Sequence, residues 1–344
     1  MPIMNLSLMR SSRSSSRTRV FSCLMKRAGK GIAKMTEKKK RVRTYKDTDE
    51  KITAKSLIKP FLFSLPFMVG LIIFTVYPFI KAVLLSFMEN YRFLSGKFTG
   101  YGLGNYQAII ADPNFINALK STTKYVLIVV PISMALSLLI AVGLNSVKKL
   151  QGLFQTVYFL PLVTSSTAIG MIFRWLYDYD YGLFNYFIGL FGIDRIHWLA
   201  DVRFTMASIC IYGIWSMLPF TIILLLAGLQ NIDPVYYTAA RADGAKSRDI
   251  FFNITIPLLM PTIILTSIVN MMSAFKVYDS LFVLYGGKPG PAFNLYTVIY
   301  YLYDMFWNKN KLGNAAASAM VLFVIIAVFT LLQNLISKKT NYYK

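Results

Sequence analysis

The sequence predicts an all-α, polytopic membrane protein with six transmembrane helices, and three observations lead to that fold class. Of its 344 residues, 56% are hydrophobic and only 15% are charged, whereas soluble domains carry about 25% charged residues. Six windows of at least 21 residues contain no Asp, Glu, Lys or Arg. A helix needs about 20 such residues to cross roughly 30 Å of hydrocarbon. The positive charge is concentrated before the first window.

The six windows are predicted to be helices because lipid offers the backbone no hydrogen-bond partners. They are Pro60–Ile80, Tyr125–Val147, Leu150–Phe173, Phe204–Ile232, Ile250–Phe275 and Leu312–Ser337. Together they place residues 57–337 in one transmembrane domain. In the third window we assign the polar run Thr164–Thr167 to satisfying backbone groups near Pro161.

The basic N-terminal segment predicts the orientation. Residues 1–56 are predicted to form a disordered cytoplasmic tail, because 17 of the 37 Lys and Arg lie within residues 1–59 against four acids. With six spans, residues 338–344 form a short cytoplasmic C-terminal tail at the same face of the membrane. Residues 1–34 have the composition of an organelle transit segment. The alternative for these residues is that translation begins at Met35.

The same arrangement assigns each connection to a side of the membrane. Residues 81–124, 174–203 and 276–311 are expected outside, and residues 148–149 and about 231–257 inside. Tyr and Trp in the outer loops suit the membrane–water interface.

Several function classes are excluded by composition. The net charge of +22 comes mainly from a tail without interleaved aromatic residues, so nucleic acid is not expected as a partner and membrane lipid is. The two cysteines, Cys23 and Cys210, and the single His197 provide no disulfide framework, metal site or His-based triad. The phosphate-binding pattern G-x-x-x-x-G-K-[ST] is absent. We therefore expect no catalytic residues, metal or cofactor in this chain, and no ATPase activity of its own.

The internal loop 231–257 carries the most information. Asp233 is predicted to be an N-cap, with Pro234 at the first helical position. Gly244 interrupts that helix, and a second short helix near the membrane face is predicted from about Ser247 to Ile254. The residues around the bend are small, which permits close approach by another protein. From these residues alone, a compact intracellular loop and a docking loop remain equally open.

The spacing of this loop resembles a known motif. Thr238-Ala239-Ala240, then Gly244, then Ile254-x-Ile256-Pro257 matches the spacing "E-A-A, three residues, G, nine residues, I-x-L-P". That motif belongs to the membrane subunits of binding-protein-dependent ABC importers. Thr238 stands where that family usually has Glu, and Ile256 stands where it has Leu. Residues from about Pro60 to Gln333, including "GNYQAII" and "YFLPLVTSSTAIGMIFRWLYDYDYGLFN", are similar to its carbohydrate branch, the maltose and glycerol-phosphate permeases.

The resemblance implies a function and a set of partners. Such a chain forms half of a translocation pathway for a sugar or oligosaccharide and works by alternating access. It implies a second homologous permease subunit, two ATP-binding cassette subunits that hold ATP and Mg, and an extracellular solute-binding protein. The residues implied to couple this chain to the ATPases are Thr238, Ala239, Ala240, Asp243, Gly244, Ile254 and Pro257.

Substrate contacts are predicted from polar and aromatic groups within or next to the spans, where such groups are costly. These are Asn270, Ser273, Lys276, Tyr278, Asp279 and Trp215. Lys276 and Asp279 are three residues apart, so they could pair on one helical face. Structural pairing near the outer surface is equally open for these two residues. The alternative substrates are a sugar phosphate or a polyol, and the alternative mechanism is secondary transport without an ATPase. A polytopic membrane enzyme would need the clustered His, acids or Cys that this sequence lacks.

Overall fold

The computed structural model describes residues 54–93, 95–147 and 151–340. Most of the predicted basic tail therefore lies outside the described residues, as do residues 341–344. The chain divides into two units, residues 1–74 and 75–344. Within these described ranges, five helices are long and apolar enough to cross a membrane: Pro60–Phe87, Pro113–Ser146, Val202–Gln230, Ser247–Phe275 and Leu312–Ile336. These five correspond to five of the six predicted spans, and the fold class is confirmed.

The first span is an uninterrupted helical run made of three parts. These are α2 (Ala54–Leu71), a π-helical turn η1 (Ile72–Val76) and α3 (Tyr77–Phe87). Pro78 follows the π turn directly. Proline has no backbone N–H and crowds the preceding turn, so a wider turn before it relieves the clash and keeps the helix continuous.

The predicted third span is broken, and this corrects the expectation of one continuous helix over Leu150–Phe173. Helix α6 (Gln151–Val163) and helix α7 (Ser166–Leu176) meet at an angle of 105°. Pro161 lies inside α6, and the Thr164 hydroxyl donates to the carbonyl of Leu160 at 2.8 Å. The same carbonyl also accepts the backbone N–H of Thr164 at 3.2 Å, so the hydroxyl adds a second donor to it.

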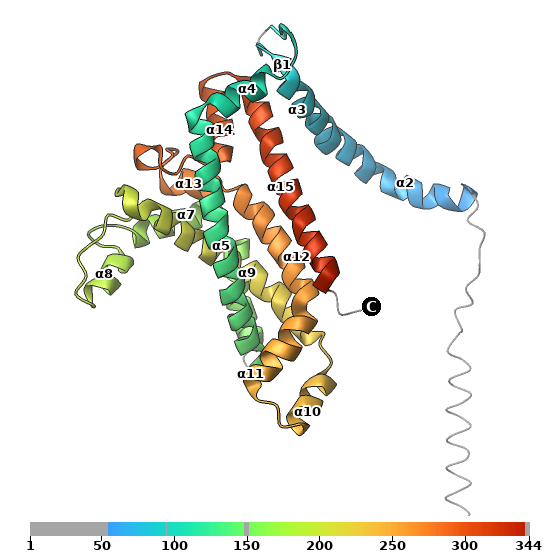
Figure 1. The fold of residues 1–344 in the computed structure, drawn as a ribbon, viewed down its shortest axis with the longest axis vertical. Coiled ribbons are helices and arrows are strands. Elements are labelled where there is room, and N and C mark those ends of the chain that lie inside the picture. The colour runs from blue at the N-terminus through green and yellow to red at the C-terminus, as the bar shows by residue number, and fades with distance from the viewer. Residues whose placement is uncertain (1–53, 94, 148–150, 341–344) are drawn as a thin grey trace, which may run out of the picture. The chain divides into compact units, whose positions relative to one another are not determined.

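Helices α5 (Pro113–Ser146) and α9 (Val202–Gln230) form the centre of the second unit. Helix α12 (Ile256–Phe275) packs against both, and α15 (Leu312–Thr340) packs against α12 and α3 (Figure 1). On α5, Ser133, Ser137 and Ala141 are fully buried at a spacing of four residues. Small side chains at this spacing let helices approach closely where lipid gives no hydrophobic force between them.

The second internal helix differs from its prediction. Helix α10 (Pro234–Ala242) forms as expected, but α11 (Ser247–Ile250) continues through a π turn, η2 (Phe251–Thr255), directly into α12. Pro257 follows this π turn, as Pro78 follows η1, and the same steric relief keeps the helix continuous. The segment predicted as a separate helix is thus the first part of the fifth span.

Short elements connect the spans. Strands β1 (Met88–Glu89) and β2 (Gly100–Tyr101) pair antiparallel, with Met88 opposite Tyr101. The remaining elements are α4 (Gly104–Ala111), α8 (Leu183–Gly189), α13 (Asp279–Leu284), a 3-10 turn η3 (Pro291–Phe293), α14 (Val298–Tyr303) and a π turn η4 (Asp304–Asn308). Figure 1 shows α10 and α11 at the end of the second unit opposite β1 and α4.

Candidate functional site

A cavity of about 310 Å³ lies among α5, α7, α9, α12 and α13. Its polar lining consists of hydroxyls, one amide and one carboxylate: Tyr125, Ser166, Tyr212, Ser216, Asn270, Ser273, Tyr278, Asp279 and Ser280. Phe220, Val269, Val277 and Met217 add apolar surface. The volume is at the lower end of the range for small-molecule pockets.

A second cavity of about 420 Å³ adjoins the first, because Ser166, Tyr278 and Asp279 line both. It lies where two helix breaks face each other. One break separates α6 from α7, and Ser165 and Thr167 line the cavity there. The other separates α12 from α13. Residues of both breaks thus line one cavity, and this juxtaposition marks the site.

Close contact between α7 and α13 holds one wall of the second cavity. A Cβ atom built on Gly170 would lie 2.5 Å from Cγ1 of Val283, and Val283 itself lines the cavity. Only a glycine at position 170 lets the two helices approach this closely. Aromatic rings form the remaining wall, where Tyr278 lies 5.4 Å from Tyr303 and 5.7 Å from Phe282 between ring centroids.

Four of the six predicted substrate residues come together in these cavities. Asn270, Ser273, Tyr278 and Asp279 line the first, and Tyr278 and Asp279 also line the second. Burial, with smaller contributions from neighbouring hydroxyls and Asp279, raises the pKa of Tyr278 to about 12. The phenol therefore keeps its proton at neutral pH and can donate a hydrogen bond to a ligand.

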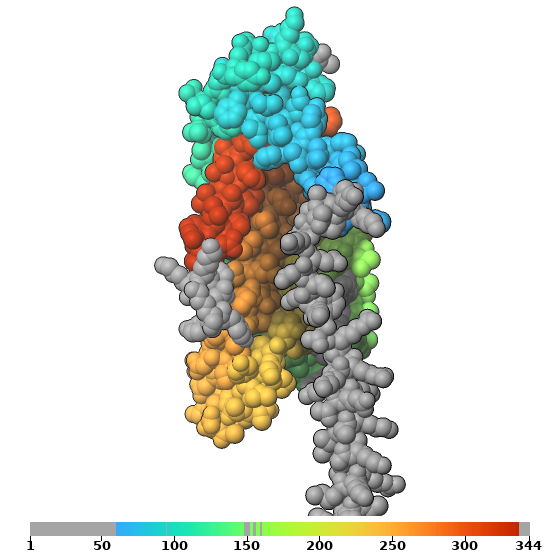
Figure 2. Space-filling model, turned by 90° about the vertical axis from the view of Figure 1, so that its right-hand side faces the viewer, coloured from blue at the N-terminus to red at the C-terminus, as the bar shows by residue number. Residues whose placement is uncertain are grey.

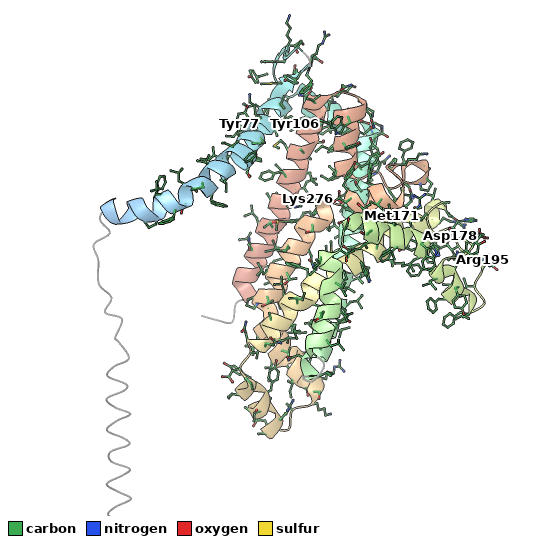
Figure 3. All side chains as sticks on the ribbon, turned by 180° about the vertical axis from the view of Figure 1, so that it is seen from behind. Tyr77, Tyr106, Met171, Asp178, Arg195 and Lys276 are labelled. Atoms are coloured by element: carbon green, nitrogen blue, oxygen red, sulfur yellow. The ribbon has the colours of Figure 1, made fainter. Side chains whose placement is uncertain are left out.

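Lys276 and Trp215 do not line either cavity. The proposed pairing of Lys276 with Asp279 on one helical face is wrong, because α12 ends at Phe275 and α13 begins at Asp279. Among the described residues, ion pairs form at Asp180–Arg195, Asp201–Arg203 and Asp304–Lys309. Figure 3 labels Lys276 at the end of α12. Trp215 packs edge-on against Phe173, with ring centroids 5.1 Å apart.

Asn270 also cross-links three spans. Its amide nitrogen donates to Oγ1 of Thr221 on α9 at 2.9 Å and contacts Sδ of Met134 on α5 at 3.5 Å. The side chain is 3% exposed. This amide therefore stabilises the helix packing as well as lining the cavity.

Sequence reasoning missed several cavity residues. Tyr125 on α5 and Tyr212, Ser216 and Phe220 on α9 line the first cavity, yet nothing in the sequence shows which helix face meets α12. A signal existed for the two tyrosines, because polar groups within a span are costly and often functional. The run Thr164–Thr167 has two roles. The Thr164 hydroxyl donates to the Leu160 carbonyl, whereas Ser165, Ser166 and Thr167 line a cavity.

The first helix of the loop after α9 and the bend at Gly244 have the predicted shape. The Asp233 carboxylate accepts from the backbone N–H of Val235 at 2.9 Å, so it caps α10. Gly244 has φ +78°. The N–H of Ala245 donates to the carbonyl of Ala240, and that of Gly244 to Arg241. These two bonds form a Schellman C-cap, which requires the left-handed residue that glycine supplies.

Helix α10 presents no buried residue, and its Val235 and Tyr236 are 67% and 50% exposed. Figure 2 shows the yellow and orange surface of this segment at one end of the second unit. Tyr237 attaches the helix to the rest of the unit, because its hydroxyl accepts from Thr255 Oγ1 at 3.4 Å. Thr238 turns back on its own helix and donates to the carbonyl of Pro234 at 3.1 Å.

The predicted coupling residues are divided between two elements. Thr238, Ala239 and Ala240 lie on α10, and Asp243 and Gly244 form its C-terminal bend. Ile254 and Pro257 lie on the continuous helix Ser247–Phe275. The motif thus joins an exposed helix to a span that ends at the cavities.

A segment that includes α8 follows α7, and Figure 3 labels Asp178 and Arg195 in it. Asn185 is 5% exposed and holds this segment together. Its amide oxygen accepts from the N–H of Ile196 and the indole of Trp198, both at 3.0 Å. A further cleft of about 780 Å³ lies between the β1–β2 hairpin and residues 310–314.

Comparison with known proteins identifies the family. Residues 133–342 match the family described as binding-protein-dependent transport system inner membrane component. The arabinooligosaccharides transport system permease protein AraP of Halalkalibacterium halodurans is 33% identical over 280 residues, covering 80% of this chain and 86% of the relative. The lactose transport system permease protein LacF of Rhizobium radiobacter is 32% identical over 280 residues, covering 80% of this chain and 93% of the relative.

A solved bacterial ABC transporter involved in the import of the acidic polysaccharide alginate has the same fold. Its chain aligns with a TM-score of 0.73 at 22% identity, over 84% of this chain and 98% of that chain. The family match over residues 133–342 and the sequence relatives place the chain in the family of binding-protein-dependent inner-membrane transport components. It is a multi-pass permease of the ABC-importer class, and the family resemblance inferred from the loop spacing is confirmed.

Proposed function

We propose that this chain forms half of the translocation pathway of an ABC importer for a sugar or oligosaccharide. The second half comes from a homologous permease subunit, two separate ATP-binding subunits hold ATP and Mg, and an extracellular solute-binding protein delivers the substrate. Relatives named for arabino-oligosaccharide and lactose transport support the substrate class. The basic segment before the first span supports cytoplasmic N- and C-termini.

The chemistry of the cavities supports a neutral, hydroxylated substrate. Hydroxyl and amide groups such as Ser216, Ser273 and Asn270 exchange hydrogen bonds with sugar hydroxyls, and rings such as Tyr212 and Tyr278 offer apolar faces. A sugar phosphate would call for Arg or Lys. Neither type is among the described residues that line the two cavities. A polyol remains compatible with this lining.

One observation carries the coupling mechanism. The helix Ser247–Phe275 runs unbroken through 29 residues from the bend after α10 to the first cavity. That length corresponds to roughly 43 Å. A displacement of α10 by the ATP-binding subunits is transmitted through the Tyr237–Thr255 contact and the base of this helix. Its other end carries Asn270 and Ser273, so movement of the motor alters the cavity.

Alternating access then follows from differential stability. ATP closes the ATP-binding pair, and closure is compatible with only one arrangement of the two α10 helices in the assembly. ATP therefore shifts the conformational equilibrium only as far as it binds one state better than the other. The solute-binding protein releases its sugar into the cavity in that state. ATP hydrolysis then returns the assembly to the inward-facing state.

The coupling role is tested at Gly244. Gly244→Val places a β-branched residue at φ +78°, which L residues with branched side chains resist. We expect ATP-dependent uptake of labelled arabinotriose or lactose by the reconstituted complex to fall at least tenfold, while membrane insertion is unchanged. Gly244→Asn should keep most uptake, because Asn tolerates this conformation.

Gly192→Val is the matched control. Gly192 has φ +74° and open space around its Cα, but it lies in the segment after α8. The same backbone penalty there should leave coupling intact. Unchanged uptake in Gly244→Val, or uptake that continues without the ATP-binding subunits, would contradict the proposal. The second outcome would favour a secondary transporter.

A further inference from the structure

The two adjoining cavities have one charged residue in common. Asp279 lines both, and among the described residues no Lys, Arg, His, Glu or second Asp lines either. Asp279 begins α13 directly after the break that follows α12, and its side chain is exposed. The carboxylate therefore faces the space through which a ligand would pass from one cavity to the other.

No positive side chain neutralises this carboxylate within the described part of the chain. Lys276 is its nearest basic residue in sequence, but it lies at the C-cap of α12, is exposed and lines neither cavity. The three ion pairs of the described residues involve other carboxylates. The other polar lining groups are neutral, so the field of Asp279 sets the sign of the potential in both cavities.

We propose that Asp279 is a charge filter that makes this half of the pathway reject anionic sugars and accept neutral ones. The inference rests on the proposed role of the cavities as the translocation pathway, and it specifies the substrate class as neutral glycans. Sugar hydroxyls donate to the carboxylate, and Tyr278, Phe282 and Tyr303 provide ring faces beside it. A uronate or sugar phosphate meets like charge at this carboxylate.

The size of the effect is set by Coulomb's law. At a separation near 6 Å and an effective dielectric constant of about 40, like charges repel enough to lower occupancy about tenfold. An aliphatic or amide residue at position 279 would remove this discrimination.

The filter is measured without knowing the natural sugar. In the complete reconstituted complex, Cys23→Ser and Cys210→Ser remove native thiols, and Ser273→Cys places a reporter in the first cavity. The rates of modification by cationic trimethylammonium-ethyl and anionic sulfonatoethyl methanethiosulfonate are compared. We expect Asp279→Asn to raise the rate of the anionic reagent and to lower that of the cationic reagent, each by about tenfold, so the cation-to-anion rate ratio falls about a hundredfold.

A control and a second reporter make every outcome informative. Tyr181→Cys lies in the segment after α7, where Tyr181 is 82% exposed, and its rate ratio should not change with Asp279→Asn. Ser166 lines both cavities. The variant Ser166→Cys therefore replaces Ser273→Cys as the reporter if Ser273→Cys destabilises the complex. An unchanged ratio at both cavity positions overturns the filter, and so does failure of both thiols to react with either reagent.

Transport separates this inference from the proposed function. The assay measures whether excess anionic trigalacturonate lowers the uptake of neutral arabinotriose by the complex. It should not lower uptake by the native chain, but it should lower uptake by Asp279→Lys. An unaltered reagent ratio with intact ATP-dependent uptake would defeat the filter alone. Absence of ATP-dependent uptake by the native complex would defeat the proposed function while leaving the electrostatic measurement standing.

Discussion

The amide nitrogen of Asn270 lies 2.9 Å from Oγ1 of Thr221, and this bond joins α12 to α9 beside the first cavity. Thr221 is fully buried and in turn donates to the carbonyl of Met217 at 2.8 Å. The helix that we propose to carry motion to the cavity is thus tied to its neighbour by a polar contact. Such a contact restrains the helix. Unlike side chains in a packed apolar core, its polar groups can exchange hydrogen-bond partners without leaving a void.

Loss of that bond should destabilise the helix bundle modestly. Hydrogen bonds between transmembrane helices contribute about 0.6 kcal/mol on average and up to roughly 1.7 kcal/mol. We expect Asn270→Leu to lower the free energy of unfolding within this range. A double-mutant cycle with Thr221→Val, measured by unfolding in detergent, isolates the pair. A coupling energy of zero would show that the amide acts only at the cavity surface.

The contact between Gly170 and Val283 predicts a steric effect. Gly170→Ala inserts a methyl group that would lie 2.5 Å from Val283 Cγ1, so α7 and α13 must separate at a cost of about 1–3 kcal/mol. We expect reduced thermal stability and reduced uptake. Val283→Ala in the same chain should restore both. Gly143→Ala, where the new methyl group meets open space, is the matched helix control and should not destabilise.

The cap of α10 predicts a local change in protection. Asp233→Ala removes the acceptor for the Val235 N–H, which should cost about 1 kcal/mol of helix stability. Hydrogen exchange across Val235–Ala242 should then quicken roughly fivefold, whereas Asp233→Ser should retain most protection. Equal hydrogen-exchange rates in the native chain and in Asp233→Ala would show that the stability of α10, in the absence of partner subunits, does not depend on this cap.

Acid stability should depend on Asp304, outside the spans. Burial acts to raise the pKa of this carboxyl, but hydrogen bonds from Asn308 and Tyr296 and the ion pair with Lys309 lower the pKa below its ordinary value of 3.8. A carboxyl whose folded-state pKa is depressed stabilises the fold above its unfolded pKa. That contribution is lost as pH falls through the folded value.

Asp304→Asn should therefore reduce the drop in thermal stability between pH 5 and pH 3, which scanning fluorimetry measures. Asp180→Asn is the control, because its pair with Arg195 is 3.4 Å long and more than half exposed, and exposed pairs contribute little. If thermal stability falls equally with pH in the native chain and in Asp304→Asn, then Asp304 does not contribute to the acid sensitivity.

The sequence predicted those parts of the fold that depend on local rules. Spans follow from the length of apolar windows, and α10 follows from the Asp233 cap, Pro234 and the left-handed Gly244. The break at Ser165 was not predicted, because a scan for charged residues does not see it and Pro161 alone is tolerated within a helix. The continuity of α11 with α12 was missed because a π turn accommodates Pro257.

The candidate site was predicted in part for similar reasons. Asn270, Ser273, Tyr278 and Asp279 follow one another near the end of one span, so polarity alone identified them. Tyr125 and Tyr212 belong to other spans, and their orientation depends on how α5 and α9 pack against α12. Lys276 and Asp279 were paired on the assumption of a continuous helix, which the break at residues 276–278 removes.

The unbroken run from Ser247 to Phe275 has a rotational consequence. Each residue of a helix advances the azimuth by about 100°, since 3.6 residues complete a turn. The direction in which Asn270 and Ser273 point is therefore phased to the bend at Gly244. Deleting one residue between Pro257 and Asn270 would swing both side chains by more than a quarter turn, whereas changing a residue's identity there leaves the phase alone. The number of residues in this segment is thus under a stricter geometric constraint than its apolar composition suggests.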